Sequence, residues 1–230
     1  MAQVLLVAAS GLAREALESI RQTGDHEVSG ILDDNADLHG TRVNGVPVLG
    51  GLQLAAQRGE QLLLCAGKGA SRAAIARRLG LPEERYATHI SAHAVLGGSV
   101  SVGAGSIILA GTVATSDVRI GRHVVLMPRV VLTHDDVLED FATLAAGAAL
   151  AGTVHVGSEA YLGTNSTVRE NLSIGRGAVL GMAAALIANL PAEQTWAGNP
   201  ARPLGTGNAG PHPAPHTEKL LKASLKEATR

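Results

Sequence analysis

Aromatic side chains are scarce in this chain of 230 residues, which has one Trp, one Phe and two Tyr. Apolar residues nevertheless make up 46% of the sequence, which is enough for a folded core and argues against general disorder. The core must therefore be filled by Val, Ile, Leu and Ala. This composition suits a narrow, repetitive interior in which bulky rings would not fit every layer.

Cysteine, net charge and long apolar runs are also lacking. The single Cys65 cannot form an internal disulfide, and no Cys-rich zinc motif is present. A formal net charge of −1 implies no polyanionic partner, so we expect no nucleic-acid binding. Arg14 and Glu15 interrupt the apolar N-terminus, and no stretch approaches the roughly 18 apolar residues of a membrane span. We therefore expect a cytoplasmic protein that does not insert into membranes.

Aliphatic residues recur every six positions from Ile90 to Leu186. The run holds one register over 17 positions, of which 16 are Ile, Leu or Val and the other is Ala114. Glycine often follows the aliphatic residue, where it relieves strain at a turn. A period of six fits neither an α-helix nor a plain amphipathic strand. It predicts a solenoid of short strands with three hexads per coil, so that residues 18 apart stack. A sandwich of short strands is the alternative, but sandwiches do not hold one register for so long.

The first 89 residues follow a different pattern, in which strands and helices alternate. Apolar strand patterns at 4–8, 28–32 and 61–66 are separated by helical patterns at 13–20, 52–58 and 70–79. This alternation predicts a small α/β domain with a parallel sheet over residues 1–89.

The chain therefore divides into three parts. The α/β domain is followed by a parallel β-helix domain over residues 90–204. Residues 205–216 are rich in Gly, Pro and His and predict a linker. Residues 217–228 have apolar positions at helical spacing, which predicts a short amphipathic helix or a frayed tail.

The turn after the first strand, Ala8–Ala13, stands where a phosphate-binding loop would lie. Backbone N–H groups at the start of the following helix could hold a diphosphate. Asp33 and Asp34 follow about 20 residues later, where an acidic side chain meets a ribose or a base. The full GxGxxG motif is missing. The residues alone leave open both a nucleotide site and a plain β-α turn with a solvated acidic loop.

His134 is the candidate general base, because histidine is the best proton acceptor near neutral pH. Asp136, two residues on, replaces the small apolar residue that the hexad requires, which indicates a local distortion or a functional site. Asp135 or Asp136 could orient the imidazole, and Gly152, one coil on, leaves open space above it. An exposed histidine on a β-helix face is the alternative.

The other solenoid histidines, His123 and His155, are expected on the surface. The three are 11 and 21 residues apart, which gives no pair on one face. We therefore expect no metal.

These features together resemble a known family. The hexads, Thr133-His134-Asp135 and Trp196–Arg202 are similar to the hexapeptide-repeat acetyltransferases. The N-terminal segments resemble the sugar acetyltransferases of the sialic-acid and bacillosamine type, in Val7–Gly11, Ile31–Asp34 and Ala66–Arg72. The resemblance covers about residues 3–204.

The resemblance implies a homotrimer with an N-terminal Rossmann-like domain over residues 1–89, which binds the nucleotide sugar, and a left-handed β-helix. The enzyme would transfer acetyl from acetyl-CoA to the amine of a nucleotide-linked amino-deoxy sugar. Such reactions serve surface polysaccharide biosynthesis. His134 would be the catalytic base, with Asp135 beside it. The residues implied for the nucleotide sugar are Ser10, Gly11, Leu12, Asp33, Asp34 and Gly67. Those implied for CoA are Thr143, Gly152, Gly163, Thr164, Gly198, Pro200 and Arg202.

Two positions depart from the family pattern. Leu12 stands where many members have His, and Thr143 stands where many have a second His. The expected mechanism is direct attack of the amine on the thioester, with a backbone N–H stabilising the oxyanion. Cys65 lies in the other domain and is not expected to act as a nucleophile. Two alternatives stay open: a sugar O-acetyltransferase that uses the same base, and a non-catalytic trimeric scaffold that binds a nucleotide or a sugar.

Overall fold

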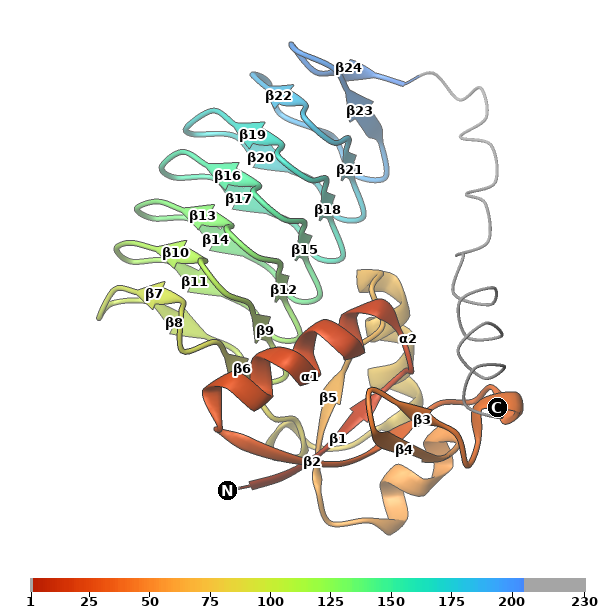
Figure 1. Ribbon diagram of the computed structural model, residues 1–230. Helices are drawn as coiled ribbons and strands as arrows, with labels where there is room; N and C mark the ends of the chain where they lie inside the picture. Colours follow the sequence, from red (N-terminus) through yellow and green to blue (C-terminus); the bar gives the residue numbers. More distant parts are fainter. Residues whose placement is uncertain (1, 205–230) are drawn as a thin grey trace, which may run out of the picture.

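Two arrangements of parallel strands follow each other along the chain (Figure 1). The computed structural model describes residues 2–204, so the linker and helix expected over 205–230 lie outside the described residues. The first arrangement is a twisted sheet with helices, and the second is a solenoid.

The N-terminal sheet has five strands in the order β3-β4-β2-β1-β5. Strand β1 lies between β2 and β5 and is parallel to both, and β4 runs parallel to β2. Residues Val4–Val7 are fully buried because β1 is central in the sheet. The bounds are β1 Ala2–Val7, β2 His26–Leu32, β3 Arg42–Val43, β4 Val46–Gly50 and β5 Gln61–Leu64.

Two α-helices accompany this sheet, α1 (Gly11–Thr23) and α2 (Gly69–Leu79). The Ser10 side chain caps the N-terminus of α1, and Gly24 ends the helix with a left-handed φ of 69°. Short 3-10 helices span Ala36–Leu38, Leu52–Gln57 and Glu83–Arg85. The helix expected at 52–58 is thus a 3-10 helix.

The solenoid consists of two-residue strands spaced six residues apart from β6 to β22. Residues 18 apart pair in parallel, as in Val113 with Val131, so three hexads make one coil as the sequence predicts. The strands are β6 His89–Ile90, β7 Val95–Leu96, β8 Ser101–Val102, β9 Ile107–Ile108, β10 Val113–Ala114, β11 Arg119–Ile120, β12 Val125–Leu126, β13 Val131–Leu132, β14 Val137–Leu138, β15 Thr143–Leu144, β16 Ala149–Leu150, β17 His155–Val156, β18 Tyr161–Leu162, β19 Thr167–Val168, β20 Ser173–Ile174, β21 Val179–Leu180, β22 Ala185–Leu186, β23 Thr195–Ala197 and β24 Arg202–Pro203.

These strands form three faces: a six-stranded sheet from β7 to β22, a five-stranded sheet from β8 to β20, and an eight-stranded sheet from β6 to β24. The second residue of most hexad strands points inward, and these aliphatic side chains form one continuous core. Each fully buried side chain of this kind contributes about 1.5–3 kcal/mol to folding. The left-handed sense of the coil stays a prediction.

Three corners connect the faces. The first corner joins the six-stranded to the five-stranded sheet and carries His134. The second joins the five-stranded to the eight-stranded sheet and carries His123. The third joins the eight-stranded sheet to the next six-stranded strand and carries residues 109–111 and 127–129.

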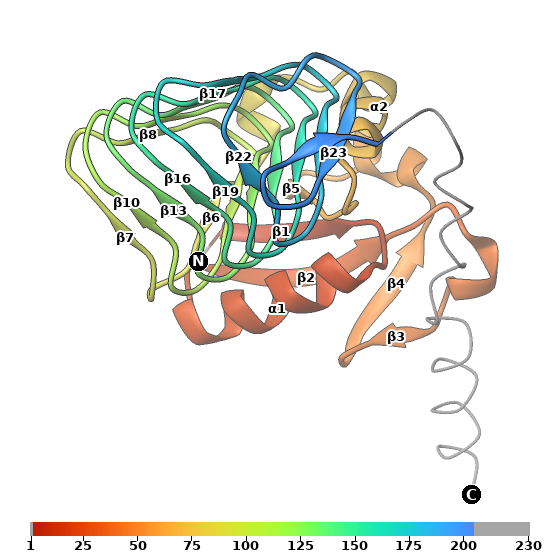
Figure 2. The same ribbon diagram turned by 90° about the horizontal axis from the view of Figure 1, so that it is seen from above.

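The N-terminal part covers the outer side of the eight-stranded sheet at its β6–β15 end (Figure 2), whereas Tyr161 of β18 is 39% exposed. The outward residues Ile107 and Val125 are buried there, in one cluster with Leu6 and Ala16. Helix α1 lies along the third corner, since its residues line a cavity with Leu109 and Met127. Helix α2 contacts the second corner through Gly69. Within residues 2–204, no other element covers the two remaining faces of the solenoid.

Candidate functional site

His134 and Asp135 form an exposed pair at the first corner, between β13 and β14. The Nδ1 atom of His134 lies 2.8 Å from Oδ2 of Asp135, and the two side chains are 65% and 59% exposed. A carboxylate at Nδ1 favours the tautomer with its proton there, which leaves Nε2 free to accept a proton. The pair thus has the geometry of a general base and its orienting acid.

Gly152 occupies the same corner one coil later and makes room for the imidazole. A Cβ atom at Gly152 would lie 2.3 Å from Nε2 of His134, closer than any real contact. A side chain at 152 would therefore displace the atom that is to accept the proton. The open space expected above His134 is occupied by the His134 imidazole itself.

Asp136 is fully buried although it replaces an apolar residue of the hexad. Its carboxylate accepts hydrogen bonds from the backbone N–H groups of Thr133 and Val154, both at 2.9 Å. Burial raises the pKa of this carboxyl to about 6. Of the two alternatives for this position, a distorted backbone is not found: Asp135 has a φ of 62°, like Asp117 (56°) and Thr153 (64°) in the adjacent coils. Asp136 instead ties the His134 turn to the next coil.

The turn after β1 is held by Ser10. Its hydroxyl donates to the carbonyl of Cys65 at 2.5 Å and accepts from the N–H of Ala13 at 3.2 Å. Gly11 follows at the helix start and lines a cavity. Leu12 is only 7% exposed and packs in the core of the N-terminal part. The Leu12 side chain is therefore not available to a substrate, and the prediction that it binds one is wrong.

Asp33 and Asp34 lie at the carboxyl end of β2, beside this turn. Asp33 accepts hydrogen bonds from the N–H groups of Ala9 (2.7 Å) and Asn35 (2.8 Å), so it joins the two loops. Asp34 is exposed and pairs with Arg78. The hydrogen bond from Arg78 lowers the pKa of Asp34.

Gly67 follows β5 at the same edge and has open space around its Cα. The carboxyl ends of β1, β2 and β5 thus bring most of the residues expected for a nucleotide to one edge of a parallel sheet, which is where such sheets bind ligands.

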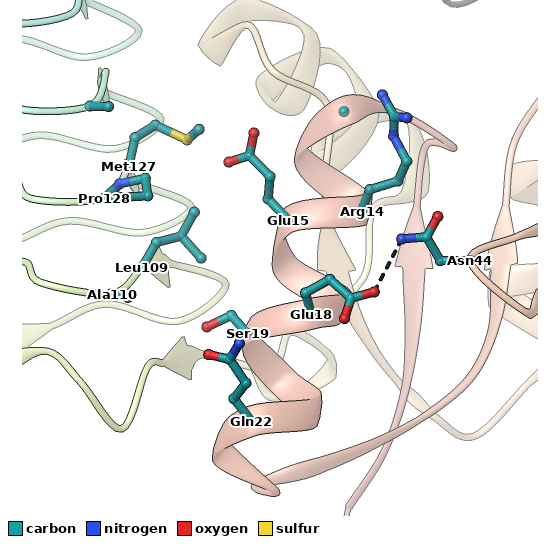
Figure 3. Close-up of a pocket in the computed structure, with 12 residues that line it drawn as sticks. Arg14, Glu15, Glu18, Ser19, Gln22, Asn44, Leu109, Ala110, Met127 and Pro128 are labelled. Atoms are coloured by element: carbon teal, nitrogen blue, oxygen red, sulfur yellow. Dashed lines mark hydrogen bonds between the residues drawn. The ribbon is translucent and has the colours of Figure 1, made fainter. Parts of the chain in front are cut away.

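A cavity of about 640 Å³ begins at Gly11 and runs between α1 and the third corner (Figure 3). This volume is in the range of small-molecule sites. Glu15 extends from α1 toward Met127, and Asn44 donates to Oε1 of Glu18 at 3.1 Å. Burial raises the pKa of Glu15. The lining residues are Gly11, Arg14, Glu15, Glu18, Ser19, Gln22, Asn44, Leu109, Ala110, Met127, Pro128 and Ala146. Sequence reasoning missed all of these except Gly11, because no local signal shows that the solenoid covers this side of α1.

Known proteins match the chain in both parts. Residues 3–79 match the family described as the PglD N-terminal domain. PerB from Caulobacter crescentus, solved in complex with CoA and GDP-perosamine, is 29% identical, with a TM-score of 0.80 over 89% of this chain and 98% of PerB. The acetyltransferase domain of PglB from Neisseria gonorrhoeae, in complex with acetyl coenzyme A, is 26% identical, with a TM-score of 0.81 over 88% of this chain and 98% of that domain.

Over both of its parts, the chain is thus similar to hexapeptide-repeat sugar acetyltransferases. A curated relative, UDP-3-O-acylglucosamine N-acyltransferase from a Caulobacter species, is 36% identical over 110 residues, which is 48% of this chain. The chain spans about a third of the length of that relative, 32%.

Apart from Thr143, the residues expected for CoA lie in three places. Gly152 is one coil after His134 at the first corner, whereas Gly163 and Thr164 follow β18 at the third corner. Gly198, Pro200 and Arg202 lie between or within β23 and β24, at the end of the solenoid. One copy of the chain therefore does not bring the first and third corners together.

Thr143 does not line a groove, which corrects the expectation for this residue. It points outward from the eight-stranded sheet, but the N-terminal part covers it, so it is only 4% exposed. Its hydroxyl accepts a hydrogen bond from Arg72 at 2.9 Å. No sequence signal places Thr143 under the other part of the chain.

His123 is also buried, which corrects its expected place on the surface. It is 5% exposed and stacks on Phe141, with ring centroids 5.0 Å apart, while Tyr86 meets it edge-on. Burial and the nearby Arg72 lower the pKa of His123 to about 4. His155 is exposed as expected and pairs with Glu139 at 2.8 Å.

Three further properties bear on the chemistry. Burial raises the pKa of the Cys65 thiol to about 12, so this residue is a poor nucleophile. Over residues 2–204, no three His, Cys, Asp or Glu side chains cluster so as to hold a metal ion. No helix in the same span is long and apolar enough to cross a membrane.

Proposed function

We propose that the protein is an acetyl-CoA-dependent N-acetyltransferase that acts on the amine of a nucleotide-linked amino-deoxy sugar. The observation that carries this proposal is the match, over nearly the whole chain, to PerB in complex with CoA and GDP-perosamine. The same two parts occur here in the same order, and His134 with Asp135 supplies a base at the solenoid surface. Acetyl-CoA is the expected co-substrate.

His134 would act as the general base in a single displacement. The amine nitrogen attacks the thioester carbonyl while Nε2 of His134 takes a proton from it, and Asp135 stabilises the imidazolium. The C–N bond forms, the C–S bond breaks, and CoA leaves as its thiol after the imidazolium returns the proton. A backbone N–H near the corner would stabilise the oxyanion. No covalent enzyme intermediate is required.

The acceptor would lie between the two parts of the chain. The N-terminus of α1 at Gly11 suits the diphosphate, because the free N–H groups of the first helical turn favour an anion. Asp33 and Gly67 border the same edge and suit the nucleoside. The cavity beyond Gly11 then suits the sugar, since it offers one polar wall from α1 and one apolar wall from Leu109 and Met127.

We propose a homotrimer in which this cavity of one copy faces His134 of the next. The six-stranded sheet supports this arrangement, because its outward residues are mostly apolar: Val95, Val113, Val131, Ala149, Thr167 and Ala185. Val95 is 64% exposed in the single chain. The first and third corners border this sheet on either side. Packing copies through it would bring the first corner of one against the third corner of the next.

A substrate panel tests the proposal. The purified protein is incubated with acetyl-CoA and, in turn, UDP-, GDP- and dTDP-linked 4-amino-sugars, and the product is identified by mass spectrometry. We expect acetylation at the amine, as an amide stable to mild base, and a rise in melting temperature with CoA. A base-labile acetyl ester would identify an O-acetyltransferase. No turnover together with no CoA binding would favour the scaffold.

A further inference from the structure

Arg72 of α2 is fully buried, and over residues 2–204 it has no carboxylate partner. Its guanidinium donates instead to neutral oxygens: the carbonyls of His123 (3.0 Å), Ala66 (2.9 Å), Gly67 (3.1 Å), Phe141 (2.9 Å) and Ala142 (3.1 Å), and the hydroxyl of Thr143 (2.9 Å). A buried charge is costly unless every donor is satisfied, and all three nitrogens are used here.

These acceptors belong to two separate parts of the molecule. Nη1 holds the carbonyls of Ala66 and Gly67, in the loop after β5. Nε donates to the second corner of the solenoid at His123, and Nη2 donates to Phe141–Thr143. One planar side chain thus fixes the distance and the angle between this loop and the solenoid. The rigid fork geometry of arginine makes it suited to this role.

Helix α2 and the solenoid are in direct contact beside Arg72. A Cβ atom on Gly69 would lie 2.2 Å from the carbonyl oxygen of Phe141, so the start of α2 touches the solenoid backbone. Burial lowers the pKa of Arg72 to about 10, which leaves the side chain charged near neutral pH.

A second, independent junction lies on the other side of the N-terminal part. His89 of β6 is fully buried, with Nε2 2.7 Å from the Ser19 hydroxyl and Nδ1 2.9 Å from Asp25. Together with the apolar cluster of Leu6, Ile107 and Val125, this junction would keep the two parts docked without Arg72. Loss of Arg72 should therefore release the loop at 66–67 rather than the whole N-terminal part.

We propose that Arg72 is a positioning residue for the acceptor: it sets the place of the Gly67 loop, and hence of the bound nucleotide, relative to the solenoid that carries the acetyl donor. This inference rests on the proposed function, because Gly67 borders the proposed nucleotide site. It also separates the two ligands. Nucleotide binding depends on Arg72, whereas CoA binding at the solenoid corners does not.

The test compares Arg72→Met with Arg77→Met, a matched exposed arginine on the same helix. Dissociation constants for UDP, GDP, dTDP and CoA are measured by calorimetry on the full-length protein, and the KM for the accepted nucleotide sugar is measured where turnover is found. For R72M we expect at least tenfold weaker nucleotide binding, a matching rise in that KM, and a CoA dissociation constant within twofold of wild type. R77M should match wild type. If R72M does not fold, Arg72→Lys replaces it, since lysine keeps the charge but brings only three donors.

A nucleotide dissociation constant within twofold of wild type in the folded variant would overturn the inference, as would an equal loss of nucleotide and CoA binding. Hydrogen exchange of the amides at 66–69 gives a readout that does not depend on any ligand. Faster exchange there in the variant, with unchanged exchange in β1, supports the positioning role, and unchanged exchange at 66–69 contradicts it. If wild type binds no nucleotide, the proposed function fails, and the exchange measurement alone decides the role of Arg72.

Discussion

At the scale of single residues, His134 depends on what stands one coil above it. The imidazole fills the space over Gly152, and Asp135 holds Nδ1. Asp136 pins the same turn from inside through two backbone N–H groups. The position of the proposed base is thus set by the stacking of adjacent coils.

Gly152→Ala should therefore inactivate the protein without unfolding it. The new Cβ would lie 2.3 Å from Nε2 of His134, and the exposed imidazole can swing away at little cost to stability. We expect kcat to fall about 10- to 100-fold, because general-base catalysis requires hydrogen-bond reach, with little change in melting temperature. Gly98→Ala is the control: Gly98 has the same corner position three coils earlier, with nothing within 4 Å of its Cβ. Equal activity of both variants would show that the ring is not where the structure puts it.

At the scale of the elements, the solenoid can be predicted from the sequence, but the burial of part of its surface by the N-terminal part cannot. The period of six fixes the strands, the three faces and the inward residues, because each coil repeats the same local rule. His123 and Thr143 obey that rule as outward or corner residues, yet both are buried. Arg72 of α2, about 50 to 70 residues away in the chain, bonds the carbonyl of His123 and the hydroxyl of Thr143. Tyr86 and Phe141 pack on the ring of His123.

The same distinction between local and distant contacts applies to the proposed nucleotide site, at the carboxyl ends of β1, β2 and β5. The alternation of strands and helices predicts a parallel sheet, and the resemblance implies Ser10, Asp33 and Gly67 for the nucleotide sugar. In the structure these three residues follow β1, β2 and β5, at the carboxyl ends of parallel strands. The helical period of α1 already puts Leu12 with Ala16 on its apolar side, so its burial was readable from the sequence. The cavity along α1 could not be predicted from the sequence, because its other wall comes from the solenoid.

The buried corner at His123 predicts a dependence of stability on pH. An unfolded histidine titrates near pH 6.5, whereas the folded pKa is about 4. As the pH falls, the unfolded chain takes up the proton first, so stability is lost between about pH 6.5 and 4 and is fully present above this range.

His123→Phe keeps a ring between Tyr86 and Phe141, keeps the backbone carbonyl that Arg72 uses, and removes the titration. Between pH 7 and pH 5, wild type should lose on the order of 1–2 kcal/mol more unfolding free energy than the variant. Urea denaturation at both pH values measures this difference. Identical losses in the two proteins would mean that His123 is protonated in the folded state.

At the scale of the whole molecule, the proposed reaction requires more than one copy of the chain. The proposed base and the acceptor cavity lie on opposite sides of the six-stranded sheet, so a single copy cannot join them. The apolar outward residues of that sheet would form the contact between two copies.

Val131→Arg should therefore give monomers and abolish turnover, because it places a charge in the centre of the proposed interface. Val137→Arg, one hexad further on the more polar five-stranded sheet, is the matched control and should remain trimeric and active. Light scattering coupled to size-exclusion chromatography measures the oligomeric state of each. A monomeric wild-type protein, or a trimeric V131R with full activity, would rule out this interface.

Acetyl transfer with His134 as the base is tested by the steady-state kinetics of His134→Ala. His155→Ala is the control, because His155 forms an equally short and exposed pair with Glu139, at 2.8 Å, on another face. With acetyl-CoA and the accepted nucleotide amino sugar, and with the trimer verified, we expect kcat of H134A to fall about 10²- to 10⁴-fold and that of H155A to stay within twofold of wild type. An H134A trimer whose kcat stays within tenfold of wild type would contradict the account.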